Sequence, residues 1–153
     1  MGIEDRLREL GIELPPPPQP VASYVPVVVS RSLAFVAGQG AMDEGRVLHP
    51  GHVGDEVTLE QARAAARRCA LQALAALKAE LGSLDRLKRI VNVAVYVSSA
   101  PGFTSQPQVA NGASDLFVEV LGEAGRHSRA AVGVAELPLG LPVEVVMVAE
   151  VDE

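Results

Sequence analysis

The run from Thr58 to Gly82 limits the fold of this chain more than any other part of its sequence. Apolar residues recur there every three or four positions, as on one face of an α-helix: Leu59, Ala62, Ala66, Ala70, Ala73, Leu77 and Leu81. Thr58 and Gln61 have capping-box spacing, and Gly82 supplies a C-terminal stop. Because many of these residues are alanines, the predicted helix can lie close on a sheet, while Arg63 and Arg67 require its other face to meet water.

Valine-rich segments predict the sheet on which this helix packs. Residues 24–29 and 33–37 are typical of a β-hairpin that ends at Gly38, Gln39 and Gly40. In residues 91–97 a valine occupies every second position, which is the period of a strand with one buried face. Residues 127–151 are interpreted as two further strands closing on a turn.

A second helix is predicted from about Gln106 to Leu121, with Gly122 as its stop. The order strand, strand, helix, strand, helix, strand, strand then predicts an α+β sandwich in which two helices pack on one face of a mixed or antiparallel sheet. Its strands supply more apolar surface than two helices can easily hide, which predicts an oligomer. The strand residues expected to supply this excess apolar surface include Val28, Val93, Val95, Val132 and Val145.

The chain is expected to consist of a leader, residues 1–20, and a single domain, residues 21–153. Within the leader, residues 3–11 fit a short helix, and Pro15–Pro18 impose an extended, polyproline-like segment. Residues 45–56, GRVLHPGHVGDE, contain turn formers and no periodicity, so we expect a surface loop there.

Charge and composition exclude several classes of partner. Thirteen Lys and Arg against nineteen Asp and Glu give a formal charge of −6, so nucleic acid is not expected. No stretch approaches the roughly 18 uninterrupted apolar residues of a membrane span, and the N-terminus lacks a signal-peptide core, so we expect no membrane partner and a cytoplasmic location. Cys69 is the single cysteine, and His49 and His52 have no ligand-type neighbours at metal-binding spacing, so no metal is assigned.

Two charged residues stand within the apolar segment 127–151. Arg129 opens its first strand and Glu144 lies inside its second. A guanidinium matches a carboxylate with a planar fork, and a held carboxylate can accept a hydrogen bond from a reacting water. Two other interpretations stay open from these residues alone: a strand-end arginine in water, or a cross-strand ion pair worth about 0.2–1 kcal/mol.

A set of residues spread over most of the chain carries a family resemblance. The set comprises Tyr24, Gly38 followed by Gln39, Asn111 ahead of Phe117, Arg129 in the segment RAAVGVAELP, and Glu144. Together they resemble the RidA (YjgF-like) family of reactive-intermediate imine deaminases, which has also been labelled endoribonuclease L-PSP. The similarity runs from about Tyr24 to Val151, and the block RxAVxVxxLPxGxPVE is its most specific part.

The resemblance implies a chorismate-mutase-like fold assembled as a homotrimer, with sites in the clefts between subunits. It implies that Arg129 binds the carboxylate of a small 2-imino or enamine acid, that Glu144 helps to position the hydrolytic water, and that a 2-oxo acid and ammonia are released. Backbone N–H groups near Gly38 would polarise developing charge, with Tyr24 and Asn111 as wall and hydrogen-bond partners. No cofactor is implied.

Two positions depart from the family pattern. Ala131 stands where family deaminases often carry a cysteine, and Ala37 stands where many have a serine. These departures leave a second interpretation open, a trimeric protein that binds or senses small carboxylates without turnover. A third, ribonuclease activity, is disfavoured by the acidic charge and the lack of a histidine pair or a basic, aromatic surface.

Overall fold

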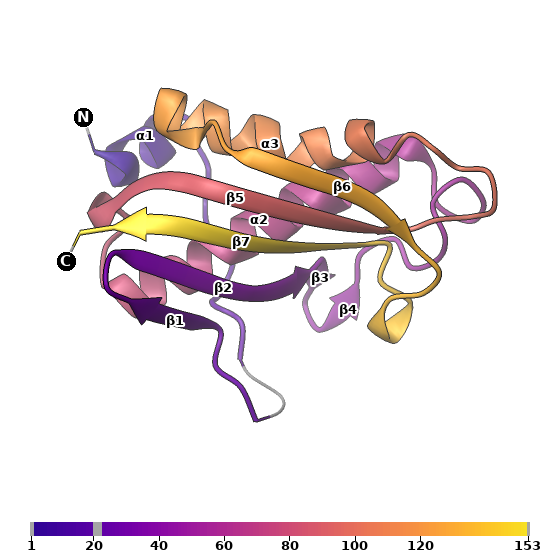
Figure 1. Ribbon diagram of the computed structural model, residues 1–153, viewed down its shortest axis with the longest axis horizontal. Coiled ribbons are helices and arrows are strands. Elements are labelled where there is room, and N and C mark those ends of the chain that lie inside the picture. The colour runs from indigo at the N-terminus through magenta and orange to yellow at the C-terminus, as the bar shows by residue number, and fades with distance from the viewer. Residues whose placement is uncertain (1, 20–22, 153) are drawn as a thin grey trace.

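Five strands form the central sheet of the computed structural model, which describes residues 2–19 and 23–152. They are β1 (Val27–Ser30), β2 (Leu33–Gly40), β5 (Leu87–Ser98), β6 (Ser128–Val134) and β7 (Val143–Val151). Their order is β1-β2-β7-β5-β6, and of these pairs β5 and β6 run parallel while the others run antiparallel (Figure 1). The predicted boundary between leader and domain falls at residues 20 and 21, which lie at the edge of the segment 20–22, outside the described residues.

The long helix predicted from the alanine-rich run is confirmed as α2 (Leu59–Leu81). Thr58 caps it with a complete capping box, because its Oγ accepts from Gln61 N–H while the Gln61 side chain accepts from Thr58 N–H. Gly82 ends the helix at φ 85°, a left-handed backbone that glycine adopts without a steric penalty. Local sequence signals therefore determine both ends of α2.

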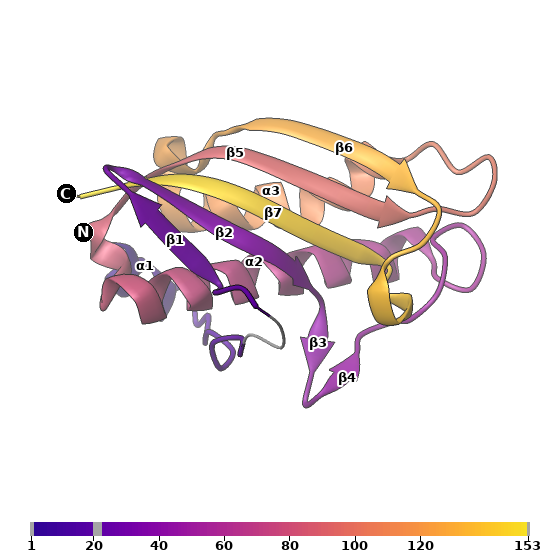
Figure 2. The same cartoon turned by 60° about the horizontal axis from the view of Figure 1, so that its bottom comes forward.

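The second helix is confirmed as α3 (Gln106–Leu121), which lies beside α2 on the same face of the sheet (Figure 2). Gly112 allows this close approach, since a Cβ at that position would lie 2.1 Å from the backbone oxygen of Arg63 on α2. The face of α3 that meets α2 and the sheet is buried: Val109, Ala110, Ala113, Leu116, Phe117 and Val120. The helices thus form one tight layer.

The predicted pairing of the last two strands is wrong. β6 and β7 do not form a hairpin, because β5 lies between them and pairs with both. The chain leaves β5, returns through α3 as a crossover helix, and adds β6 parallel to β5 at the sheet edge. It then passes the end of β5 through a short 3₁₀ turn, Pro138–Gly140, and enters the sheet as β7 between β5 and β2.

Two strands contain irregularities that the alternating sequence did not predict. In β5 the register against β7 shifts between Ile90 and Asn92, so Ile90 is fully buried while Val91 is 37% exposed, contrary to the predicted alternation. In β2 the register against β7 shifts between Val36 and Gln39. The Gly38–Gln39–Gly40 segment therefore continues the strand instead of ending it.

The start of the first strand and the segment after β2 differ from the sequence predictions. The first strand begins at Val27 rather than at Tyr24, since Pro26 before it has no N–H to donate to the sheet. Two short strands, β3 (Met42–Asp43) and β4 (Arg46–Val47), form a small hairpin beyond β2. The loop that follows is not wholly at the surface, because Val53 within it is fully buried and bonds the end of β5.

The leader is part of the folded unit. Its helix α1 (Ile3–Glu9) contacts α3 and the 3₁₀ turn Leu84–Arg86, and Leu7 is 4% exposed. The Glu4 carboxylate accepts from Lys78 Nζ and from Leu84 N–H, both at 2.9 Å. Residues 12–19, which include the four prolines, contain no helix or strand. The leader thus ties the C-terminal end of α2 to the body of the protein.

The two faces of the sheet have different environments. Val93, Val95 and Val145, which were predicted to add to an unhidden apolar surface, face the helices and are fully buried. Val28 and Val132 lie on the other face and are 52% and 46% exposed. The α+β fold class is confirmed, with α1 as a third helix beside α2 and α3. Among the described residues, no helix combines the length and apolar character needed to cross a bilayer.

Candidate active site

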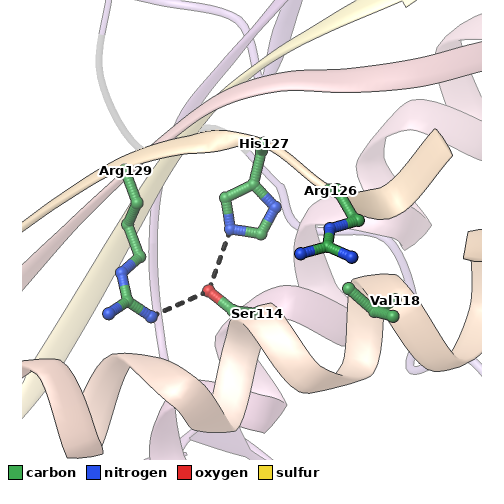
Figure 3. A pocket seen from close by; sticks show the side chains of 5 residues that line it. All are labelled: Ser114, Val118, Arg126, His127 and Arg129. Atoms are coloured by element: carbon green, nitrogen blue, oxygen red, sulfur yellow. Dashed lines mark hydrogen bonds between the residues drawn. The ribbon is translucent and has the colours of Figure 1, made fainter. Parts of the chain in front are cut away.

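Arg129 lies at the start of β6 and faces α3, where two neutral side chains hold its guanidinium; Figure 3 shows one of them, Ser114. Its Nη1 donates to Asn111 Oδ1 at 2.8 Å and to Ser114 Oγ at 3.1 Å. Asn111 and Ser114 are three residues apart on α3, so both point to the same side of the helix. The sequence predicted Asn111 and Arg129 as partners in one site, and the structure brings them into direct contact.

This arrangement leaves the charge of Arg129 available to a ligand. Both hydrogens of Nη1 are used, whereas Nε and Nη2 have no acceptor among the described residues. The ion pairs of the described chain do not include Arg129, so no carboxylate neutralises it. The edge formed by Nε and Nη2 is one of the geometries in which a guanidinium binds a carboxylate bidentately.

An open pocket of about 210 Å³ lies against Arg129 (Figure 3). Its lining combines two guanidinium groups, an imidazole, a hydroxyl and one apolar side chain: Arg126, Arg129, His127, Ser114 and Val118. Burial, together with the nearby charge of Arg129, lowers the pKa of His127, which favours the neutral imidazole. Arg126 pairs with Glu123 at 3.8 Å, so the pocket is cationic chiefly through Arg129 and suits a small anion.

Ser114 and His127 were not among the residues predicted for the site from the sequence. Ser114 Oγ lies 2.9 Å from His127 Nε2, so these two residues continue the hydrogen-bond network of Arg129. Two signals in the sequence could have indicated them. Ser114 follows Asn111 at helical spacing, and His127 precedes Arg129 by two residues, as expected for two side chains on the same face of a strand.

Glu144 and Gly38 form a second part of the predicted site, on the other side of the sheet. A Cβ at Gly38 would lie 2.8 Å from Glu144 Oε2, so the glycine makes room for this carboxyl group next to the bulge in β2. Burial raises the pKa of Glu144. A carboxyl group with a raised pKa can both accept and donate a proton closer to neutral pH than an exposed one.

The structure does not bring the two parts together within one chain. Arg129 is the register partner of Val93, which faces the helices, whereas Glu144 is the partner of Tyr96, whose neighbours Val95 and Val97 face the helices. The two side chains thus leave the sheet on opposite faces. Their strands are separated by β5, about 10 Å across the sheet.

This separation excludes one of the interpretations that the sequence left open, the cross-strand ion pair between Arg129 and Glu144.

Tyr24 is 50% exposed and precedes β1 at the opposite edge of the sheet from Arg129. Since Pro26 O accepts from Ala37 N–H, Tyr24 lies toward the end of the sheet that carries Gly38. It therefore groups with Glu144 rather than with Asn111 and Arg129.

The other residues singled out in the sequence lie outside these two parts. Cys69 is fully buried in α2, and burial raises the pKa of its thiol well above the usual range. His52 contacts Glu56 and Glu136 at the surface, which raises the pKa of its imidazole. Within the described residues, no group of three or more His, Cys, Asp and Glu side chains is arranged to hold a metal ion.

The fold and these residues match a known protein family. Residues 4–151 match the family described as "YjgF/chorismate_mutase-like, putative endoribonuclease", so the chain belongs to the YjgF family. Protein TCP17 of Trypanosoma cruzi is 46% identical to it over 147 residues, which cover 95% of this chain and 92% of TCP17.

Two solved structures are also similar over nearly the whole chain. Protein Atu1372 from Agrobacterium tumefaciens has a TM-score of 0.90 and 44% identity, covering 98% of this chain and 92% of that one. A Shewanella oneidensis protein, whose name carries the same endoribonuclease description, has a TM-score of 0.94 and 33% identity, covering 99% and 100%. The family predicted from the sequence is therefore confirmed.

Proposed function

We propose that this protein hydrolyses small 2-imino acids, formed from reactive 2-enamino acids, to 2-oxo acids and ammonia. The observation that carries the proposal is Arg129, whose guanidinium is fixed by two neutral acceptors and keeps one bidentate edge and its full charge for a ligand. A fixed guanidinium of this kind suits the carboxylate that all 2-imino acids share. In the solved structure of E. coli TdcF, which is 20% identical and has the same fold, serine is bound.

The proposed reaction adds one water across the C=N bond. The water oxygen bonds to C2 of the imine, the C–N bond then breaks, and both water protons end on the nitrogen, which leaves as ammonia. Glu144 has the raised pKa expected of a group that receives a proton from the attacking water and returns it to the leaving nitrogen. Backbone N–H groups beside Gly38 can approach the substrate closely, because no Cβ intervenes.

The proposed site requires two copies of the chain. Arg129 and Glu144 leave opposite faces of one sheet, so a substrate held by Arg129 of one copy would meet Glu144 of another. The face that carries Glu144 also exposes apolar side chains, among them Val28, Phe35 and Val132, which favours its burial against a second copy. A closed ring of three copies would contain three such sites.

The test is the release of ammonia and 2-oxo acid from freshly generated 2-iminopropanoate and 2-iminobutanoate. We expect Arg129→Ala to lower kcat/KM by at least about 100-fold, since a hydrogen-bonded charge pair is lost in the transition state. Arg129→Lys keeps the charge without the fork and should lose most of this activity as well. Arg46→Ala, an exposed arginine on β4, is the matched control and should retain the activity of the unchanged protein.

One observation favours a second candidate, a binding protein without turnover. Ala131 follows Arg129 on the same face of β6 and presents only a methyl group where family deaminases often have a thiol. Under this alternative the protein would bind 2-oxo acids in an Arg129-dependent manner without accelerating release of ammonia. The same set of variants decides between the two functions.

A further inference from the structure

We propose that Ser114 and His127 form a hydrogen-bond relay that runs from the backbone oxygen of Gly125 to Arg129. This relay fixes the orientation of the guanidinium. This inference rests on the proposed function, in which Arg129 binds the carboxylate of the substrate. It assigns Ser114 and His127 as positioning residues, because their polar side-chain atoms are already bonded within the network that holds Arg129.

The first step of the relay fixes the imidazole. His127 Nδ1 lies 2.7 Å from Gly125 O, and a carbonyl oxygen can only accept, so Nδ1 carries the proton. The ring also meets Phe117 edge-on, with ring centroids 5.8 Å apart and planes at 90°, which restricts its rotation. Nε2 of the neutral ring is then left as an acceptor directed at α3.

The second step fixes the hydroxyl group. Ser114 Oγ is 2.9 Å from His127 Nε2 and 3.1 Å from Arg129 Nη1. Arg129 can only donate, and Nε2 can only accept, so the hydroxyl proton must point to His127 and a lone pair must point to Arg129. Without His127 the hydroxyl could rotate its proton toward the guanidinium, which would break the contact with Arg129.

The third step concerns charge. Burial and the neighbouring cation Arg129 both lower the pKa of His127 from its ordinary value of 6.5, which favours the neutral ring at pH 7. A neutral relay holds Arg129 and leaves its charge intact. An Asp or Glu at position 114 would instead neutralise that charge. Asn111 supplies the second neutral acceptor on the same Nη1 atom, so the relay and the amide together leave the Nε and Nη2 edge for the ligand.

The experiment measures binding of 2-oxobutanoate by NMR titration and, where turnover is found, kcat and KM for 2-iminobutanoate. The variants are Ser114→Ala, Ser114→Thr, His127→Phe, Arg129→Ala and the pairwise combinations with Ser114→Ala. We expect Ser114→Ala and His127→Phe each to weaken binding about five- to tenfold, which is within the range of one lost hydrogen bond. Ser114→Thr keeps a hydroxyl and should stay within about twofold of the unchanged protein.

Coupling between the variants separates a relay from a general structural effect. Residues that act through one another give non-additive changes, so Ser114→Ala with His127→Phe should bind no more weakly than either single variant. In the Arg129→Ala background, Ser114→Ala should have no further effect. Additive losses in these pairs, or unchanged binding by folded Ser114→Ala, would overturn the relay.

The outcomes also separate this inference from the proposed function. If Arg129→Ala loses binding and Ser114→Ala does not, the relay is wrong and the carboxylate site stands. If the unchanged protein neither binds nor converts these acids, the proposed function fails, and ¹⁵N NMR of His127 decides on the relay alone. A ring protonated at Nδ1, with an Nε2 shift that changes in Ser114→Ala, supports it, whereas a ring protonated at Nε2 contradicts it.

Discussion

Arg129 and Glu144 leave opposite faces of the same sheet, on strands that β5 separates. Arg129 is bound by two side chains of α3, whereas Glu144 lies beside Gly38 at the bulge of β2. Each residue therefore has its own structural support, and neither depends on contact with the other. This separation allows the two residues to be tested independently and in combination.

Asn111→Asp should weaken carboxylate binding more than Asn111→Ala. The aspartate would place a negative charge 2.8 Å from Arg129 Nη1, at the position of the present amide oxygen, and would neutralise the guanidinium. The alanine variant removes one hydrogen bond and leaves the charge. Titration with 2-oxobutanoate measures both, and equal affinities for the two variants would show that the net charge at Arg129 does not determine binding.

Glu144→Gln should lower activity and raise stability at neutral pH. Burial raises the pKa of Glu144, so the folded protein binds this proton more tightly than the unfolded chain does. The resulting stabilisation is fully present below the ordinary pKa of 4.5 and is lost as the pH rises through the raised value. At pH 7 the variant should therefore have the higher Tm, with kcat reduced by about 100-fold or more.

The same comparison at low pH provides the control for this prediction. The difference in Tm between Glu144→Gln and the unchanged protein should shrink as the pH falls through the raised pKa, and should be nearly gone below 4.5, where both carry a neutral side chain at position 144. A variant that is less stable at pH 7, or a difference that does not change with pH, would show that Glu144 is not a destabilised carboxyl group in the folded protein.

Gly112→Ala should destabilise the helix layer, because overpacking usually costs about 1–3 kcal/mol. The added Cβ would lie 2.1 Å from Arg63 O, a backbone atom that can move only if the whole helix shifts. Alanine favours a helix over glycine by roughly 1 kcal/mol, so the net loss of stability should be up to about 2 kcal/mol. Urea unfolding measures the difference, and Asp115→Ala, an exposed change on α3, should stay within about 0.5 kcal/mol of the unchanged protein.

The helices could be predicted from the sequence because the signals that define them are local. Thr58, Gln61 and Gly82 lie within a few residues of the helix ends that they determine, and the apolar spacing of α2 and α3 is visible along the chain. The strands as elements were also predictable from valine-rich segments. Their pairing was not, because β6 and β7 are close in the sequence yet both pair with β5.

The bulges explain a second group of errors. A single extra residue moves every following side chain of a strand to the other face, and no local pattern marked the shift at Ile90 or the one before Gln39. For the site, the family resemblance indicated Arg129, Asn111, Gly38 and Glu144. Their division between two faces, and the links through Ser114 and His127, depended on the fold.

A site shared between two copies can be tested by mixing two inactive variants, Arg129→Ala and Glu144→Gln. If each site takes its arginine from one copy and its glutamate from another, unfolding and refolding an equal mixture will give sites that contain both intact residues. Random assembly predicts about a quarter of the activity of the unchanged protein for such shared sites. Each variant refolded alone should remain inactive. A mixture as inactive as its components, in oligomers shown to have exchanged their subunits, would contradict a site built from Arg129 and Glu144 of different copies.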